Sequence, residues 1–480
     1  MAVLASEIDT LLQRAARIAA DYLESSLDRD QPIVAWRAPE ELEALLQLEL
    51  PRVGRPLDEV VADAETFLRH SVRTGHPRFF NQLFNHLDPA AVLGEWLAAV
   101  ANSSMYTYEA APVFTLMEEK LGEKLCSLAG FDQGEALLNP GGSVSNLMAM
   151  LAARNRSFPR CRVDGFGPAE RPAVFASEEA HYSIARAASI CGFGLRGARA
   201  VPCDEHGAMV PAELERAVER AAEEGLTPFF VCATSGTTMA AAYDPIEAVA
   251  EVAGRRGLWL HVDAAYGGNV LFSPAHRGLM AGVERADSVS WNPHKTMAVP
   301  LHCSALLMRD RGELHATFAT NADYLFHDTD EGNRDRGDLT LQCGRRVDAL
   351  KLWLAWQAQG DEGYRRRVEH AFESVAAARR MVLERDGLEL VREPRGCNLL
   401  FRWVPEEWRA TPLAERPVQA MDSVNVELRE RLKRSGRVML NYSRIDGRVA
   451  LRLVLTHPEL TAEDLAETFD AVELAGAGSL

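Results

Sequence analysis

Two ionisable side chains, Asp263 and Lys295, each follow directly on an apolar stretch, in HVDAAYGG and SVSWNPHKT. An aspartate at the end of a strand can pair with a protonated pyridine nitrogen, and Ala265 beside it leaves room for a flat ring. Partial burial of a lysine in this position lowers its pKa, which favours an amine that forms an imine. Taken singly, Asp263 is also typical of a residue that caps a turn, and Lys295 of a surface lysine with a buried stem.

A glycine-rich segment and a histidine add to this pattern. In PGGSVSN, two glycines and two serines precede a helix that we expect from Asn146 onward, so its first backbone N–H groups can bind an anion. In SEEAHYSI, His181 lies between a strand and a helix, where its imidazole can stack on a ring and contact a substrate carboxylate. In isolation, the first segment is also typical of a turn with serine caps.

Together the four segments provide a partner for each part of pyridoxal 5'-phosphate (PLP). The glycine-rich segment binds the phosphate, His181 stacks on the ring, Asp263 keeps the pyridine an electron sink, and Lys295 holds the cofactor as a Schiff base. The sequence therefore predicts a PLP enzyme whose catalytic residues are Lys295, His181 and Asp263.

The elements that must position these segments are those of an α/β fold. From 76 to 345, apolar runs such as TPFFVCAT and GLWLHVDA alternate with helical patterns such as PIEAVAEVAGRRG. This alternation predicts a large domain with a mostly parallel sheet covered by helices on both faces. Residues 1–75 have helical patterns, which predicts an N-terminal helical arm packed on another subunit or domain. Residues 346–480 predict a smaller C-terminal α+β domain.

The composition limits the partners and the compartment. The 480 residues carry a formal net charge of −17, which argues against a nucleic acid or an anionic membrane as partner. No apolar run reaches the length that a membrane span needs, and no basic leader precedes an apolar stretch. The eight cysteines form no CxxC pair and no cluster with histidine at zinc spacing. We therefore expect reduced thiols, no metal site and a cytoplasmic protein.

The motifs NPHK (292–295) and HVDAAYGG resemble the lysine and aspartate motifs of the group II PLP-dependent amino acid decarboxylases of fold type I. The resemblance extends from about residue 70 to the end. It is closest to the acidic-substrate branch, the glutamate, cysteine sulfinate and aspartate decarboxylases, in segments such as HPRFFNQL, QCGRRVDALKLWLAW and LRLVLTHPELT. It implies a homodimer with shared active sites. It also implies a cofactor-binding set, namely Gly142, Ser143, Val144, Ser145, His181, Thr237, Asp263, Ala265, Asn292, His294 and Lys295.

The same resemblance implies residues that contact the substrate. In the glutamate enzymes a glutamine in the FFNQL segment and an arginine near the C-terminus line the pocket, and Gln82 and Arg452 match them. Arginine is suited to holding a carboxylate through two hydrogen bonds, although Arg452 is also typical of a salt bridge at the rim. Phe84, Tyr106 and Ser143 are more similar to the cysteine sulfinate and aspartate enzymes. We therefore expect a short acidic substrate: aspartate, cysteine sulfinate or a sulfonate or phosphonate analogue, with glutamate still open.

One segment departs from the family's pattern. The decarboxylases have a loop after the YLF motif with a tyrosine that reprotonates the carbanion after carbon dioxide leaves. Here YLFHDTDEGNRDRGDLTLQCGR (324–345) is about two residues shorter and has no tyrosine after Tyr324, while His327 can replace the acid. Three interpretations therefore stand: an amine-forming decarboxylase, an enzyme that forms an aldehyde by oxidative deamination, and a non-catalytic PLP-binding scaffold.

Overall fold

The computed structural model describes residues 2–320 and 334–478, and the chain separates into two compact units. The larger unit comprises residues 87–373 and 392–398, and the smaller comprises residues 1–86, 374–391 and 399–480. These limits differ from the divisions at 75 and 345 expected from the sequence. The three-part division into arm, large domain and small domain stays a prediction.

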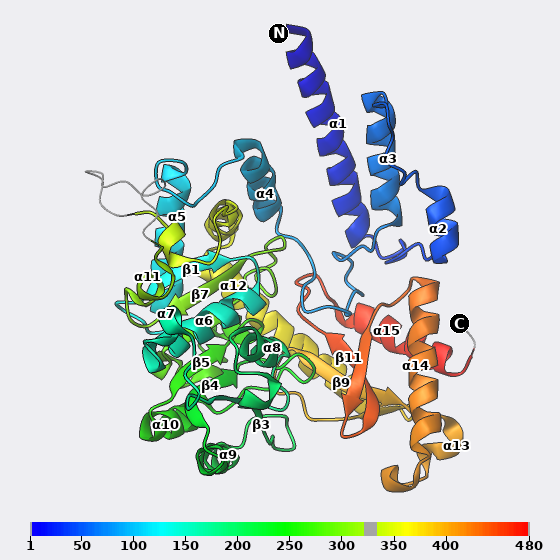
Figure 1. The fold of residues 1–480 in the computed structure, drawn as a ribbon. Coiled ribbons are helices and arrows are strands. Elements are labelled where there is room, and N and C mark those ends of the chain that lie inside the picture. The colour runs from blue at the N-terminus through cyan, green and yellow to red at the C-terminus, as the bar shows by residue number, and fades with distance from the viewer. Residues whose placement is uncertain (1, 321–333, 479–480) are drawn as a thin grey trace. The chain divides into compact units, whose positions relative to one another are not determined.

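The larger unit is built on a seven-stranded sheet. Its strands are β1 (Glu135–Asn139), β2 (Pro172–Ser177), β3 (Ala198–Val201), β4 (Thr227–Thr234), β5 (Trp259–Asp263), β6 (Ser288–Trp291) and β7 (Ser304–Met308). They lie in the order β1-β7-β6-β5-β4-β2-β3 (Figure 1). All neighbours from β6 to β3 are parallel, whereas β7 is antiparallel to both β1 and β6. The mostly parallel sheet predicted from the sequence is therefore confirmed.

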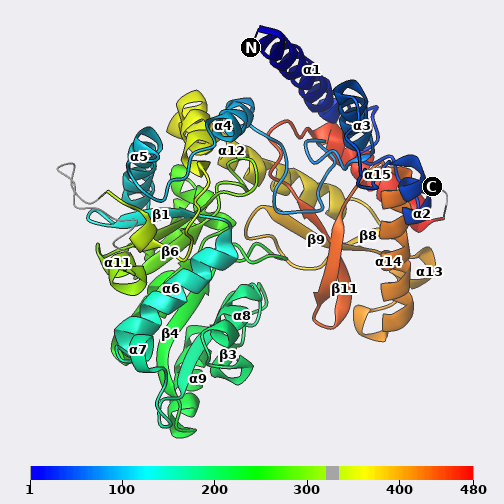
Figure 2. The same cartoon turned by 45° about the horizontal axis from the view of Figure 1, so that its top comes forward.

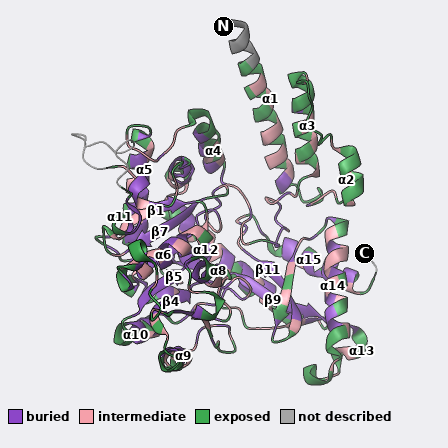
Figure 3. Cartoon of the chain, in the orientation of Figure 1, coloured by how far each residue is buried: buried purple, intermediate pink, exposed green. Residues whose placement is uncertain are grey.

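Helices cover both faces of this sheet, because its strands are apolar on both sides. Val174, Phe230 and Cys232 belong to one buried cluster, and their sequence neighbours Phe175 and Val231 belong to the other. Figure 2 shows α6 lying across the strands, and Figure 3 shows the strands buried. The helices of eight or more residues that lie wholly in this unit are α4 (Pro89–Ala101), α5 (Pro112–Leu128), α6 (Gly142–Ser157), α8 (Ser183–Ile190), α9 (Pro211–Glu223) and α10 (Ile246–Arg256), and α12 (Asp348–Leu383) belongs to it up to residue 373. The shorter α7 (Cys161–Asp164) and α11 (Glu313–Phe318) complete this set.

The smaller unit contains a four-stranded antiparallel sheet. Its strands are β8 (Leu388–Leu390), β9 (Asn398–Trp403), β10 (Asn441–Ile445) and β11 (Arg448–Val454), in the order β10-β11-β9-β8. Residues of β9 and β11 share a buried cluster with α14 (Val418–Ser435) and α15 (Ala462–Gly476). The long helix α12 (Asp348–Leu383) enters this unit after a break at Gly360, where φ is 59°. The helices α1 (Ala2–Leu27), α2 (Pro39–Leu45) and α3 (Leu57–His70) also belong to it.

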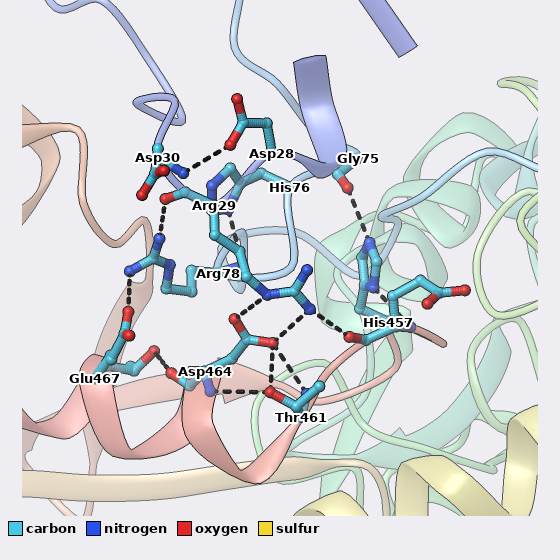
Figure 4. A network of polar contacts seen from close by, with 12 residues as sticks. Asp28, Arg29, Asp30, Gly75, His76, Arg78, His457, Thr461, Asp464 and Glu467 are labelled. Carbon is cyan, nitrogen blue, oxygen red and sulfur yellow. Dashed lines mark hydrogen bonds and ion pairs between the residues drawn. The ribbon is translucent and has the colours of Figure 1, made fainter. Parts of the chain in front are cut away.

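A network of polar contacts in the smaller unit ties the residues that follow α1 to α15 (Figure 4). Arg29 donates from Nε and Nη2 to the two carboxylate oxygens of Asp464, at 2.8 and 2.9 Å. Asp464 also accepts from the backbone N–H of Thr461 at 3.0 Å, which completes a capping box at the start of α15. Burial acts to raise the pKa of Asp464, but the hydrogen bond from Arg29 holds it below its usual value.

Two neutral histidines lie in the same network. His457 Nε2 lies 2.9 Å from the carbonyl oxygen of Gly75, while His457 Nδ1 accepts from the N–H of Glu459 at 3.0 Å. His76 Nδ1 accepts from the N–H of Arg78 at 3.0 Å. Burial lowers the pKa of His457 to about 3 and that of His76 to about 4. Both side chains are therefore uncharged in the folded protein at neutral pH.

No helix in the described part of the chain is both long enough and apolar enough to cross a bilayer.

Because His457 and His76 are uncharged in the folded protein, acid should destabilise the smaller unit. A histidine whose folded pKa lies below its unfolded value of about 6.5 takes up a proton on unfolding, so its stabilisation is complete above pH ~6.5 and is lost as the pH falls toward 4 and below. We expect the free energy of unfolding to fall by on the order of 3 kcal/mol across this window for His457, measured by urea titration at a series of pH values. His457→Gln should flatten this slope, whereas His315→Gln, at an exposed site on α11, should keep it. An unchanged slope in His457→Gln would contradict the assignment.

Candidate active site

Lys295 lies in a turn that follows β6 and is half-buried. Its backbone N–H donates to the carbonyl oxygen of Asn292 at 3.0 Å. The neighbouring His294 is buried, and its Nδ1 lies 2.5 Å from the carbonyl oxygen of Cys303, which joins the turn to the start of β7. Burial lowers the pKa of His294 to about 3. The imidazole of His294 is therefore neutral and adds no positive charge next to Lys295.

The fully buried Lys351 provides a contrast within the same unit. Its ammonium lies 2.9 Å from Glu95 and 2.8 Å from Asp348. Burial acts to lower the pKa of Lys351, but these carboxylates raise it above its usual value. Lys351 is therefore held as an ammonium ion in a structural ion pair and is unsuited to forming an imine.

Asp263 is the last residue of β5, and its carboxylate is buried among three donors. Oδ2 accepts from Asn146 Nδ2 at 2.8 Å, while Oδ1 accepts from the N–H of Ala265 at 3.1 Å and from Ser290 Oγ at 3.2 Å. These donors come from α6, from the turn after β5 and from β6. Three hydrogen bonds to a buried carboxylate stabilise its charged form and fix its direction.

His181 precedes α8 and shares its electrostatic environment with the other two predicted catalytic residues. Its Nδ1 lies 2.9 Å from Ser183 Oγ and accepts from the N–H of Ser183 at 3.3 Å. Burial lowers the pKa of His181; the charge of Asp263 opposes this shift and that of Lys295 adds to it. His181 therefore lies within Coulombic reach of both Asp263 and Lys295, while the catalytic roles of the three residues stay a prediction.

The first turn of α6, called the cradle below, lies close to Asn292 and Ala265. Gly141 has φ 110° and precedes Gly142, and a Cβ on Gly142 would lie 2.9 Å from Asn292 Nδ2 and 3.4 Å from the Ala265 side chain. The first N–H groups of a helix have no acceptor inside it. The N–H groups of Val144 and Ser145 already donate to the carbonyl oxygen of Gly141, at 3.0 and 3.3 Å. The N–H groups of Gly142 and of the exposed Ser143 are therefore the ones that would bind a phosphate.

Two polar side chains near this cradle, Asn292 and Ser145, test whether PLP fits it. The buried Asn292 Oδ1 has no hydrogen-bond partner among the residues that the structure describes, which suits a site completed by another molecule. Ser145, by contrast, points into the core, where its hydroxyl lies 2.9 Å from Ser304 Oγ and accepts from Asn139 Nδ2 at 3.3 Å. The residues fit the cofactor, with the backbone rather than the Ser145 hydroxyl available for the phosphate.

Thr237 is buried in the turn after β4, beside the end of β5. The N–H of Ser235 donates to the carbonyl oxygen of Asp263 at 2.8 Å, and Thr237 Oγ1 accepts from the N–H of Ala242 at 3.1 Å. Thr237 is therefore next to the ring-binding segment, and its own contact with the cofactor stays a prediction.

The predicted substrate residues lie in two places. In the smaller unit, the buried Arg452 donates from Nη2 to the carbonyl oxygen of Asn81 at 2.7 Å, which places the guanidinium beside Gln82. Gln82 is exposed and Phe84 is half-buried. In the larger unit, the carbonyl oxygen of Tyr106 accepts from the N–H groups of Arg336 and Gly337 at 3.1 and 2.8 Å. His327 lies outside the described residues, so its role as an acid stays a prediction.

The side chains that hold Asp263 and His181 were not predicted from the sequence. Asn146 was identified only as the start of a helix, and Ser183 and Ser290 were not singled out. Asn146 contacts Asp263 across 117 residues of sequence. The expectation that this helix begins at Asn146 was wrong: α6 begins at Gly142, which places Asn146 within the helix, where its amide contacts Asp263 at the end of β5.

Comparison with known proteins agrees with this geometry. Residues 39–404 match the model described as "Pyridoxal-dependent decarboxylase conserved domain". Cysteine sulfinic acid decarboxylase of Mus musculus is 42% identical over 474 residues, which cover 98% of this chain and 96% of that one. Glutamate decarboxylase of Drosophila melanogaster is 37% identical over 477 residues, which cover 98% and 93%. A crystal structure of mouse CSAD has a TM-score of 0.95 at 42% identity and covers 98% of this chain and 99% of that one.

Gly142 allows a direct test of the cradle. In Gly142→Ala the added methyl group would lie 2.9 Å from Asn292 Nδ2, so the first turn of α6 or Asn292 must shift. We expect the affinity for PLP, measured by equilibrium dialysis, to fall about ten- to a hundredfold, the range for losing a hydrogen bond to a charged group. Gly254→Ala in α10 is the matched control, because nothing lies within 4 Å of the added carbon. Equal affinities in the two variants would show that the cradle does not bind the cofactor.

Proposed function

Because this chain belongs to the family of PLP-dependent decarboxylases, we propose that it removes the α-carboxylate of a short acidic L-amino acid, such as cysteine sulfinate or aspartate, to give the amine and carbon dioxide. The observation that supports the proposal is that His181, Asp263 and Lys295 follow or end three parallel strands of one sheet, β2, β5 and β6, and that His181 lies within Coulombic reach of the other two. An acidic amino acid is the substrate class named for the relatives that align over nearly the whole chain.

The chain's own residues divide the work in this site. Bound PLP supplies an electron sink for the pair of electrons left when carbon dioxide departs. Lys295 supplies the amine that holds the cofactor, and Asp263 supplies a fixed negative charge for the pyridine nitrogen. His181 packs beside the ring and can donate from Nε2, since its Nδ1 already accepts from Ser183. The first turn of α6 binds the phosphate through its N–H groups.

Arg452 is the proposed partner of the second anionic group of the substrate. A buried guanidinium binds an acidic group strongly because its hydrogen bonds are fixed in direction and little water competes. Its hydrogen bond to the carbonyl oxygen of Asn81 orients it beside Gln82. Phe84, Tyr106 and Ser143, which resemble the cysteine sulfinate and aspartate enzymes, favour a side chain shorter than that of glutamate.

We also propose that the protein acts as a cytoplasmic homodimer. The helix α4 exposes an apolar stripe of Leu93, Trp96, Leu97 and Val100, which are 52%, 41%, 45% and 73% exposed. The spacing of these residues places them on one helical face, and exposed apolar patches of this kind are typical of subunit interfaces. A second copy of the chain would bury this face. All eight cysteines are free, as suits a reducing compartment.

Product analysis tests the proposed reaction. The PLP-loaded protein, checked for a dimer by light scattering, is incubated with cysteine sulfinate, aspartate, cysteate, phosphonoalanine, glutamate and DOPA, and carbon dioxide, amine and aldehyde are followed together. We expect amine and carbon dioxide from a short acidic substrate. Arg452→Lys should lower kcat/KM by about ten- to a hundredfold, since one ammonium cannot replace a two-pronged contact.

Each other outcome would contradict a particular part of the proposed function. Aldehyde with ammonia would favour oxidative deamination, which the absence of a tyrosine after Tyr324 in the segment 324–345 makes the second candidate. Turnover of DOPA but of no acidic substrate would exclude the roles given to Gln82 and Arg452. Cofactor binding without any product would favour a non-catalytic scaffold.

A further inference from the structure

Asn146 lies at the centre of a buried chain of hydrogen bonds that links Asp263 to His181. Its Nδ2 lies 2.8 Å from Asp263 Oδ2 and 3.0 Å from Ser183 Oγ, and its Oδ1 lies 3.0 Å from His261 Nε2. Asn146, Ser183, His261 and Asp263 are each 5% exposed or less. Every polar atom of the Asn146 side chain therefore has a partner that water does not compete for.

The charge of Asp263 sets the direction of the hydrogen bonds toward His181. An ionised carboxylate only accepts, so the amide of Asn146 must present Nδ2 to it. The second N–H of Nδ2 then donates to Ser183 Oγ, which leaves the Ser183 hydroxyl proton for His181 Nδ1 at 2.9 Å. The backbone N–H of Ser183 also donates to that nitrogen. His181 Nδ1 accepts twice and carries no proton.

The hydrogen bonds on the other side of Asn146 also have a consistent order of donors and acceptors. With Nδ2 facing Asp263, Oδ1 accepts from His261 Nε2, so His261 carries its proton there. Burial lowers the pKa of His261 to about 4, so it is neutral and its Nδ1 accepts from Ser288 Oγ at 2.9 Å. The Ser288 hydroxyl accepts in turn from Trp259 Nε1, a group that can only donate, at 2.9 Å. From Trp259 to Asp263 each donor meets an acceptor, so the orientation of Asn146 is fixed from both ends.

We propose that Asn146 is a positioning residue that uses the charge of Asp263 to hold His181 as a neutral imidazole with its proton on Nε2. The inference rests on the proposed function, in which both residues contact the cofactor. In this form His181 donates one hydrogen bond to the substrate and has no free nitrogen to accept a proton. His181 therefore acts as a hydrogen-bond donor and not as a base.

The tautomer is measured directly by ¹⁵N NMR of the histidine side chains, with and without PLP. The His181 signals are assigned by their loss in His181→Gln. In the wild-type chain we expect an unprotonated Nδ1 and a protonated Nε2. A protonated Nδ1 in the wild-type chain overturns the proposal, whatever the variants do.

Three variants test the role of Asn146. Asn146→Asp replaces the donor with an acceptor, so the Ser183 hydroxyl turns to the introduced carboxylate and the added charge favours a protonated His181. We expect the Nδ1 signal of His181 to move toward the protonated form, and the affinity for PLP to fall about ten- to a hundredfold. Ser183→Ala removes the hydroxyl through which Asn146 acts on His181, so the Nδ1 signal should move in the same direction but less far, because the backbone N–H of Ser183 still donates to Nδ1. Asn269→Asp is the matched control: Asn269 is buried and accepts from Trp291 Nε1 at 2.9 Å, which a carboxylate can also do.

The outcomes separate this inference from the proposed function. His181 signals and PLP affinity in Asn146→Asp that equal those of the wild type overturn the inference while leaving the decarboxylase assignment intact. The same shift in Asn269→Asp also overturns it, because the effect would then follow from any buried charge. A wild-type chain with the expected tautomer but no visible absorbance from bound PLP would overturn the proposed function, and with it the catalytic role of the tautomer.

Discussion

The buried carboxylate of Asp263 is the constraint on which the rest of the site depends. A carboxylate this deep in the protein needs several donors, because an unpaired charge there would cost more free energy than the fold can supply. Its donors come from α6, from β6 and from the turn after β5. Satisfying one charge therefore brings together the N-terminus of α6 and the strand that leads to Lys295. The same contacts leave the charge oriented for a cationic ring nitrogen.

The parallel sheet makes this convergence possible. The carboxyl ends of parallel strands meet at one edge, so the residues that follow β4, β5 and β6 are neighbours there. Small residues then allow close approach: a Cβ on Gly142 would crowd Asn292, and one on Gly268 would lie 2.8 Å from the Trp291 ring. Glycine at positions 142 and 268 therefore allows the close packing that the site needs.

Much of this arrangement was predictable from local patterns. The strands β4 and β5 are mainly apolar, β6 alternates serine with apolar residues, and each is followed by or ends in a polar residue or turn that belongs to the site. The short β1 (EALLN) and β3 (ARAV) were not among the predicted strands, because apolar runs of this length do not distinguish a strand from part of a helix. The partners of Asp263 were missed for a different reason. The hydrogen bond from Asn146 joins residues far apart in the chain, and one sequence does not show which polar side chains meet in space. Ser145 illustrates the same limit, because its place in a phosphate-binding motif gave no sign that its hydroxyl points to Ser304.

The most direct test of the central claim is to trap the bound cofactor on the protein and locate it. Borohydride reduction of the PLP-loaded chain converts an imine to a stable secondary amine, and peptide mass spectrometry then identifies the lysine that carries it. The site described above predicts the pyridoxyl group on Lys295 alone. Label on Lys120, Lys124, Lys351 or Lys433 instead, or on no lysine, would contradict the assignment of the active site.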